Sequence, residues 1–198
     1  MSSTKRGRSR KRHDTYPTPA WCVRRLLKAV HLPGGQWLEP CAGNGAIIKA
    51  VNAEMKIPVY WTACEIRTGP IPALNLIKPA IGKIITGDFF SIPEEQHRGY
   101  SVAITNPPFI LASEFIERCI PMASHTLMLL RLNFVASEKR ADFMRNTRPD
   151  IYVLPNRPSF VGGGKTDSIE YAWFHWFDGC TGKLRVLDST SKVERRGK

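Results

Sequence analysis

Strand-like and helix-like segments alternate along most of this chain, and this alternation restricts the fold more than any other feature. Runs such as "PVYWTACEI" (58–66) and "HTLMLLRLNF" (125–134) are apolar almost throughout and contain many residues that favour strands. Between such runs, apolar residues recur at helical spacing, as in "SEFIERCI" (113–120). Strands with apolar residues on both faces are typical of a sheet covered by helices on both sides. The pattern therefore predicts an α/β fold with a mostly parallel, seven-stranded sheet.

Most of the net charge of +12 lies at the two ends of the chain. Residues 1–12 contain six basic residues and no acid, and residues 189–198 contain four basic residues and one acid. We expect one folded domain over 15–188, between a basic tail at 1–14 and a second at 189–198, both without fixed structure. Such tails suit a polyanion such as nucleic acid, and a purely solubilising role is the alternative. The basic residues of the first tail are Lys5, Arg6, Arg8, Arg10, Lys11 and Arg12.

The sequence lacks the patterns of membrane, secreted and zinc-binding proteins. No apolar run approaches the roughly 20 residues that a membrane-spanning helix needs. The basic N-terminal residues are not followed by the apolar segment of a secretory signal. The five cysteines are scattered and form no Cys-x-x-Cys pair, which argues against a zinc site or a disulfide framework. We expect a cytoplasmic protein with reduced thiols.

Residues that could bind a ligand follow four consecutive predicted strands. They are Glu39-Pro-Cys-Ala-Gly-Asn-Gly (39–45), Glu65, Asp88-Phe89 and Asn106-Pro-Pro-Phe (106–109). In an open α/β sheet the carboxyl ends of parallel strands meet at one edge, and ligands bind there. A single acid at a strand end is more often a surface or capping residue. Four such strand ends at one edge indicate a binding site.

The chemistry of these strand ends fits an adenosine group without a pyrophosphate. Gly43 and Gly45 would let the backbone approach a ligand closely, but Ile48 occupies the position of the third glycine in a dinucleotide fingerprint. Glu65 is placed to accept hydrogen bonds from two ribose hydroxyls. Asp88 could accept a hydrogen bond from the adenine amine, and the aromatic side chain after it could offer a face for the ring.

The stretch from Asn106 to Phe109 has the properties of an amine-binding segment. Proline lacks an N–H, so Pro107 and Pro108 leave only carbonyl acceptors, and each favours an extended backbone in the residue before it. With the Asn106 side-chain oxygen, the segment offers two acceptors to the two hydrogens of one NH2 group. Such bonds would hold the nitrogen lone pair out of conjugation, while Phe109 contacts an aromatic ring that carries the amine. A tight turn with a capping asparagine is the alternative.

These motifs, in this order, resemble those of the S-adenosylmethionine-dependent amino methyltransferases with a Rossmann-like fold. The resemblance spans residues 15–178 and includes "YPTP" (16–19), "EPCAGNG" (39–45), "GDFF" (87–90) and "NPPF" (106–109). The NPPF version of the catalytic motif is the one associated with the N6 amine of adenine. The stretches "RPSF" and "TDSIEYAWFHWF" are similar to the closing strands of small DNA adenine methyltransferases from phages and prophages.

The resemblance implies roles for individual residues. Tyr16 and Thr18 would contact the methionine end of the cofactor, above a floor of glycines. Glu65 would bind its ribose and Asp88 its adenine amine. Cys41-Ala42 departs from the Asp-Pro of many relatives. The candidate cofactor-binding residues are Tyr16, Thr18, Glu39, Cys41, Gly43, Gly45, Glu65, Ile66, Asp88 and Phe89. The candidate catalytic residues are Asn106, Pro107, Pro108 and Phe109.

The resemblance also implies a reaction, the transfer of a methyl group from S-adenosylmethionine to the N6 amine of adenine in DNA, with the base flipped out of the duplex. Methylation of RNA adenine or of a protein glutamine is the alternative among enzymes, and a non-catalytic nucleic-acid-binding protein is the alternative from another class. The residue directly after Pro108 is Phe109 and not a cysteine, which disfavours methylation of a cytosine ring carbon. The implied location is the cytoplasm of a bacterium or of a phage-infected cell. Besides the first tail, the residues expected to contact nucleic acid are Lys139, Arg140, Arg157 and Lys165.

Overall fold

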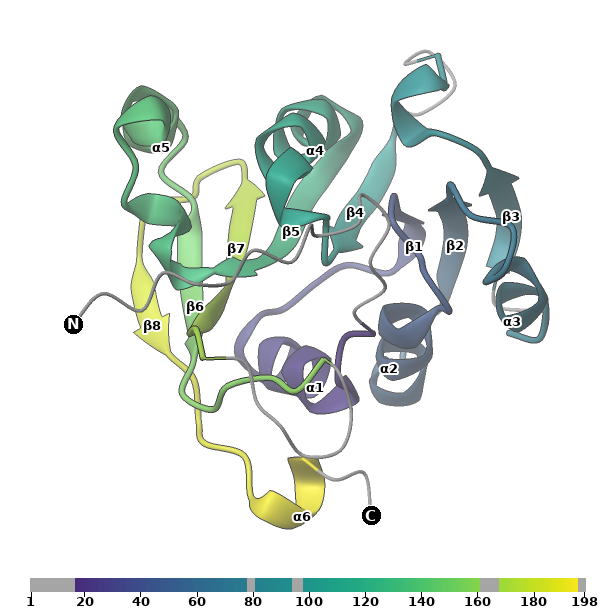
Figure 1. Ribbon diagram of the computed structural model, residues 1–198, viewed down its shortest axis with the longest axis horizontal. Coiled ribbons are helices and arrows are strands. Elements are labelled where there is room, and N and C mark those ends of the chain that lie inside the picture. The colour runs from purple at the N-terminus through teal and green to yellow at the C-terminus, as the bar shows by residue number, and fades with distance from the viewer. Residues whose placement is uncertain (1–16, 78–80, 94–97, 161–167, 196–198) are drawn as a thin grey trace, which may run out of the picture.

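The computed structural model describes residues 17–77, 81–93, 98–160 and 168–195, which form an eight-stranded sheet with helices on both faces (Figure 1). The strands are β1 Gly35–Glu39, β2 Val59–Glu65, β3 Ile81–Thr86, β4 Tyr100–Thr105, β5 Ala123–Arg131, β6 Asp150–Leu154, β7 Tyr171–Phe177 and β8 Leu184–Val186. The α-helices are α1 Ala20–Ala29, α2 Ala46–Glu54, α3 Ile71–Asn75, α4 Ala112–Cys119, α5 Ala141–Thr147 and α6 Lys192–Arg195. Among the described residues, no helix combines the length and the apolar character needed to span a bilayer.

The sheet is mostly parallel, as predicted, and its strand order is β3-β2-β1-β4-β5-β7-β6-β8. In the part of the sheet with the order β3-β2-β1-β4-β5, each strand is parallel to its neighbours, and β6 is parallel to β8. The exception is β7, which lies between β5 and β6 and is antiparallel to both. Because β1 to β5 run in the same direction, their carboxyl ends lie at one edge of the sheet (Figure 1). This is the edge at which ligands bind in open α/β sheets.

The prediction of seven strands is wrong by one, because no sequence pattern marks β8. This strand has three residues, and all three are exposed. Leu184 and Val186 are 64% and 59% exposed, so β8 buries no apolar face. It lies at one end of the sheet, next to β6. A strand this short and exposed produces no recognisable periodicity.

Side chains of the central strands alternate between two cores, one on each face of the sheet. Trp37 and Trp61 pack with α1, α2 and α3 on one face, and their ring centroids are 5.3 Å apart. Leu38, the next residue along β1, packs with α4 on the other face. The Trp37 indole N–H donates a hydrogen bond to Pro33 O at 3.0 Å, and the Trp61 indole N–H donates one to Asn52 Oδ1 at 2.9 Å. These strands are apolar on both sides because helices cover both sides.

The C-terminal segment packs against α1 (Figure 1). Arg25 Nε donates a hydrogen bond to Thr190 Oγ1 at 2.8 Å, and Arg25 also forms a 2.8 Å ion pair with Glu194 on α6. Thr190 is buried. The expectation that residues 189–198 lack fixed structure is therefore wrong as far as Arg195. The last three residues of this tail, and the whole N-terminal tail, lie outside the described residues.

Candidate functional site

The predicted ligand-binding segments lie at the same edge of the sheet. Strand β1 ends at Glu39 and β2 ends at Glu65, while β4 ends directly before Asn106. Asp88 follows β3 and precedes the short 3-10 helix Phe89–Ser91. The pairing of β2 with β3 continues to Glu65, the last residue of β2. The structure thus brings these four strand ends together.

The glycine loop between β1 and α2 borders this site. Gly43 and Gly45 have φ values of 53° and 75°, in the left-handed region that favours glycine. A Cβ added at Gly43 would lie 4.0 Å from its nearest neighbour, a guanidinium nitrogen of Arg67, so there is room beside this residue. A Cβ added at Gly45 would collide with Cδ1 of Ile77. The left-handed backbone at 45 therefore favours glycine, and the contact with the Ile77 side chain adds to this preference, while the cofactor-binding role expected for Gly45 stays a prediction.

The Glu65 carboxylate is buried and accepts hydrogen bonds from two segments. Its Oε2 accepts from the Gly43 N–H at 2.7 Å, and its Oε1 accepts from the Arg67 backbone N–H at 3.0 Å and from Arg67 Nε at 2.7 Å. Arg67 Nη2 also lies 3.2 Å from Oε2. Burial alone would raise the pKa of Glu65, but the hydrogen bonds and charge of Arg67 and the Gly43 N–H lower it. The oxygens expected to bind a ribose are therefore already bonded to Arg67.

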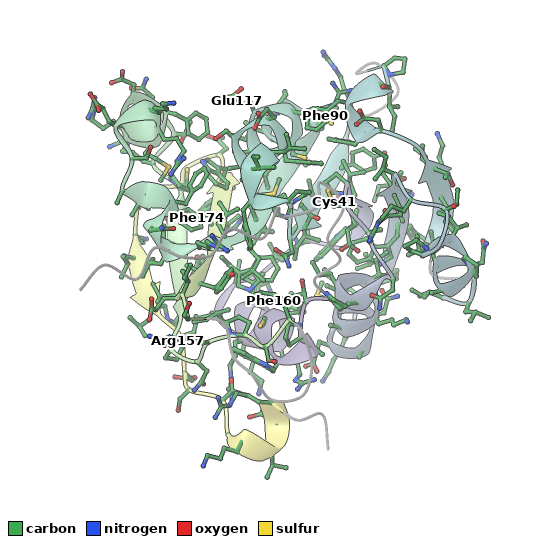
Figure 2. All side chains as sticks on the ribbon, in the orientation of Figure 1. Cys41, Phe90, Glu117, Arg157, Phe160 and Phe174 are labelled. Carbon is green, nitrogen blue, oxygen red and sulfur yellow. The ribbon has the colours of Figure 1, made fainter. Side chains whose placement is uncertain are left out.

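A second carboxyl group, that of Glu39, is buried at the end of β1. It is 2% exposed, and its Oε2 has no hydrogen-bond partner among the described residues. Burial and the nearby Glu65 charge raise the pKa of Glu39 well above its usual value, and a hydrogen bond with the Ile48 backbone opposes them only in part. Burial likewise raises the pKa of the neighbouring Cys41 thiol (Figure 2). An unpaired buried oxygen is costly, so this position suits a ligand that brings a hydrogen-bond donor.

The segment after β3 corrects the expectation for Phe89. Asp88 is exposed, and its Oδ1 accepts a hydrogen bond from the Phe90 N–H at 3.0 Å, which caps the short helix. Phe89 is 3% exposed and stacks on Phe115 of α4, with ring centroids 5.6 Å apart. Because its ring is packed in the core, it cannot provide a face for adenine. Ile66, which follows β2 and is 47% exposed, offers an apolar surface at this edge.

Asn106 contacts a residue from the start of the described chain. Its Nδ2 donates a hydrogen bond to Thr18 Oγ1 at 3.2 Å. Asn106 is half-buried, whereas Thr18 is 5% exposed. Pro107 is buried and Pro108 is half-buried beside it. The predicted amine-binding segment (106–109) therefore lies against the residues that lead into α1.

The ring of Phe109 is half-buried and has two close neighbours. The Arg131 guanidinium lies over the ring, 4.6 Å from its centroid, and the buried Tyr171 ring packs at 5.7 Å. Arg131 Nε is buried and has no hydrogen-bond partner among the described residues. The expected open face for a target base is thus covered on one side, and a base that stacks on that side would have to displace Arg131.

The predicted nucleic-acid-binding residues differ in their surroundings. Lys139 is exposed. Arg140 lies 4.2 Å from the centroid of the Phe134 ring, and its Nε donates to Phe134 O at 2.9 Å. Arg157 Nε donates to the Glu170 carboxylate at 3.0 Å. Both arginines therefore already have protein partners. The predicted site residues that lie outside the described residues are Tyr16, Lys165, Lys5, Arg6, Arg8, Arg10, Lys11 and Arg12.

Two features of the site were not predicted from the sequence. Arg67 was not expected to bind Glu65, and its only signal is its place two residues further along the chain. The contact between Thr18 and Asn106 joins positions 88 residues apart and has no sequence signal. No cluster of three or more side chains suited to a metal ion occurs in the part of the chain that the structure describes.

No protein-family model and no curated protein matches this sequence. Solved structures do resemble it. One is a protein from Listeria monocytogenes assigned to the class I S-adenosylmethionine-dependent methyltransferases (11% identity, TM-score 0.59, 90% of this chain and 65% of that one). Another is a modification subunit assigned to a type I restriction enzyme of Vibrio vulnificus YJ016 (13% identity, TM-score 0.60, 94% of this chain and 49% of that one). A third is the 23S rRNA methyltransferase ErmE (13% identity, TM-score 0.59, 85% of this chain and 72% of that one).

These similarities concern the fold. The chain has an α/β, Rossmann-like methyltransferase fold, which confirms the predicted fold class. It spans less than two thirds of the length of the first two of these proteins. At identities of 11–13% a shared fold does not carry a shared substrate, so the activity has to be argued from the site.

Proposed function

We propose that this protein transfers a methyl group from S-adenosylmethionine to the N6 amine of adenine in DNA. The observation that carries the proposal is the position of Asn106-Pro-Pro-Phe (106–109) at the end of β4, beside β1 and its glycine loop. An amine-binding segment and an adenosine-binding segment on neighbouring strands are what this transfer requires. The fold shared with the class I methyltransferase and with the restriction modification subunit supports the proposal.

The described residues fit S-adenosylmethionine. The buried Oε2 of Glu39 lacks a partner and would accept a hydrogen bond from the ammonium group of the methionine part. The Glu65 carboxylate would accept from the ribose hydroxyls once Arg67 moves aside. The exposed Asp88 would accept from the adenine amine, and Ile66 would contact the ring. When bound, the cofactor supplies an activated methyl group on a sulfonium.

The chain's own residues would position the target amine. Asn106 Oδ1 and a proline carbonyl would each accept one hydrogen bond from the NH2 group, which keeps the nitrogen lone pair out of the ring's conjugation and available as a nucleophile. The base would have to leave the duplex stack to reach Asn106, and Phe109 would pack against it. The amine loses one proton in the overall reaction. The rate acceleration would come from positioning of the reactants and from electrostatic stabilisation, without a covalent enzyme intermediate.

The alternatives differ in the molecule that carries the amine. An adenine in RNA would present the same base to Phe109, and one structural neighbour is a 23S rRNA methyltransferase. A protein glutamine has the same NH2 group but no ring for Phe109. A non-catalytic nucleic-acid-binding protein would need neither the NPPF segment nor the buried Glu65 carboxylate at this edge.

Incubation with methyl-labelled S-adenosylmethionine and DNA, RNA or protein tests the proposal. We expect label in DNA, and nucleoside mass spectrometry should identify it as N6-methyladenine. The protein should be produced in a host without DNA methyltransferases, with Asn106→Ala as the control for contaminating activity. Label in RNA or protein, or N4-methylcytosine in DNA, would show that the proposed substrate is wrong and that the labelled molecule is the substrate. No label in any of the three would refute the enzyme assignment.

Replacing Arg67 by alanine should strengthen cofactor binding. Arg67 bonds to both oxygens of Glu65, so ribose hydroxyls must displace it. Its side chain is 26% exposed, so the ion pair is partly screened, and removing it should lower the Kd of S-adenosylmethionine by up to about tenfold. Titration calorimetry on wild type and Arg67→Ala measures this, with Arg145→Ala, which breaks an exposed ion pair on α5, as the matched control. Weaker binding in Arg67→Ala would show instead that Arg67 holds the cofactor.

Deleting residues 1–12 should reduce the salt dependence of DNA binding without changing sequence preference. The deletion removes six basic residues, half of the net charge of +12. If each contacts one phosphate, the slope of log K against log salt concentration should fall by up to about 5, at ~0.9 per contact. Binding isotherms over a salt series, for full-length and truncated protein on two unrelated duplexes, measure both quantities. An unchanged slope would contradict the role of the tail, and a lost preference would show that the tail reads bases.

A further inference from the structure

A buried hydroxyl holds the side-chain amide of Asn106. Asn106 Nδ2 donates to Thr18 Oγ1 at 3.2 Å, across 88 positions of the sequence. Thr18 is 5% exposed, and its side chain does not cap α1, whose N-cap residue is Pro19. The Thr18 hydroxyl therefore lies next to the proposed amine-binding segment and is used there as an acceptor.

The orientation of this amide decides what Asn106 offers to a substrate. A side-chain amide has an oxygen acceptor on one side and an NH2 donor on the other. When Nδ2 is bonded to Thr18, Oδ1 points to the opposite side. A target amine brings N–H donors and needs that oxygen, whereas the reversed amide would place one NH2 group against another. In the structure, the Thr18 contact thus holds the amide in the one of two orientations that can bind an amine.

We propose that Thr18 is a positioning residue that holds the side-chain amide of Asn106 in place for methyl transfer. This inference rests on the proposed function and deepens it. It differs from the cofactor contact that the family resemblance implies for Thr18, because it acts on the rate of transfer and not on cofactor affinity. The β-branched side chain has few rotamers, so the hydroxyl is held in place as well as buried.

Two substitutions of Thr18 separate the hydroxyl from the shape of the side chain. Thr18→Val keeps the shape and removes the hydroxyl, whereas Thr18→Ser keeps the hydroxyl. We expect the single-turnover rate to fall at least about tenfold in Thr18→Val and to stay within about threefold of wild type in Thr18→Ser. The cofactor Kd from calorimetry should change less than about twofold in both. A wild-type rate in Thr18→Val, or a loss explained by weaker cofactor binding, would overturn the proposal.

A second background separates positioning from a structural effect. Asn106→Asp replaces the amide by a carboxylate with two equivalent oxygens, so no orientation has to be selected. Adding Thr18→Val to Asn106→Asp should therefore change the rate less than about twofold. If Thr18→Val lowered the rate equally in wild type and in Asn106→Asp, the substitution would act by disturbing the structure around the site, and the proposal would be overturned.

The contact can also be followed without any activity. In 15N-labelled protein, the side-chain amide hydrogens of Asn106 should exchange with solvent at least about tenfold faster in Thr18→Val than in wild type, with Thr18→Ser close to wild type. Equal exchange in wild type and Thr18→Val would overturn the proposal even if the Asn106→Asp variants are inactive. Because this measurement needs no substrate, a wild-type protein that methylates nothing would refute the proposed function while the Thr18 contact is still tested.

Discussion

Asn106→Ala should lower the single-turnover rate of methyl transfer by about 10²–10³-fold, the range observed when one preorganised hydrogen-bonding group is removed from a transition state. The substitution removes the Oδ1 acceptor, so one N–H of the target amine loses its partner and the lone pair returns to conjugation with the ring. Asn106 is half-buried at the end of β4 and outside both apolar cores. The fold and the cofactor Kd should therefore stay close to those of the wild type.

Rapid-quench assays with labelled cofactor and saturating DNA measure this rate, and thermal unfolding monitors the fold. Asn75→Ala is the matched control, because Asn75 is an exposed asparagine at the end of α3. A near-normal rate in Asn106→Ala would remove the NPPF segment from the chemistry. If Asn106→Ala lowered the melting temperature and Asn75→Ala did not, the loss of methyl transfer would be explained by impaired folding.

Glu65→Ala should weaken binding of S-adenosylmethionine by tenfold or more. The substitution removes the acceptor for the ribose, and with it the acceptor of the hydrogen bonds from the Gly43 N–H and Arg67 Nε. A charge-assisted hydrogen bond contributes about 1.5–3 kcal/mol, which corresponds to a change in Kd of roughly 10- to 100-fold. The direction is opposite to that expected for Arg67→Ala, because Arg67 competes with the ribose for the same carboxylate.

Calorimetry with the cofactor alone measures this affinity without any methyl acceptor. Glu117→Ala is the matched control, because Glu117 is exposed on the outer side of α4, away from the glycine loop (Figure 2). The double variant Glu65→Ala/Arg67→Ala should bind no more tightly than Glu65→Ala, since Arg67 acts through Glu65. Unchanged affinity in a folded Glu65→Ala protein would contradict the adenosine site.

The fold class and the place of the site could be predicted from the sequence because both depend on local patterns. Strands that are apolar throughout predicted a sheet covered on both faces, and β5 is indeed buried along most of its length. Once the strands are parallel, residues that end successive strands must share an edge, which is how Glu65 and Asn106 come together. The strand β8 escaped prediction because its three residues are exposed and have no periodicity.

The tertiary structure alone decided which partner each side chain has. Two consecutive phenylalanines follow Asp88 and both rings contact Phe115 of α4, but only the tertiary packing decides that Phe89 is buried whereas Phe90 is half-buried. Arg67 bonds to Glu65, and Thr18 bonds to Asn106 across 88 positions. Periodicity specifies which face of a helix or strand is buried, because that face repeats along the chain. A side chain's partner depends instead on where distant elements meet, and no local repeat records that position.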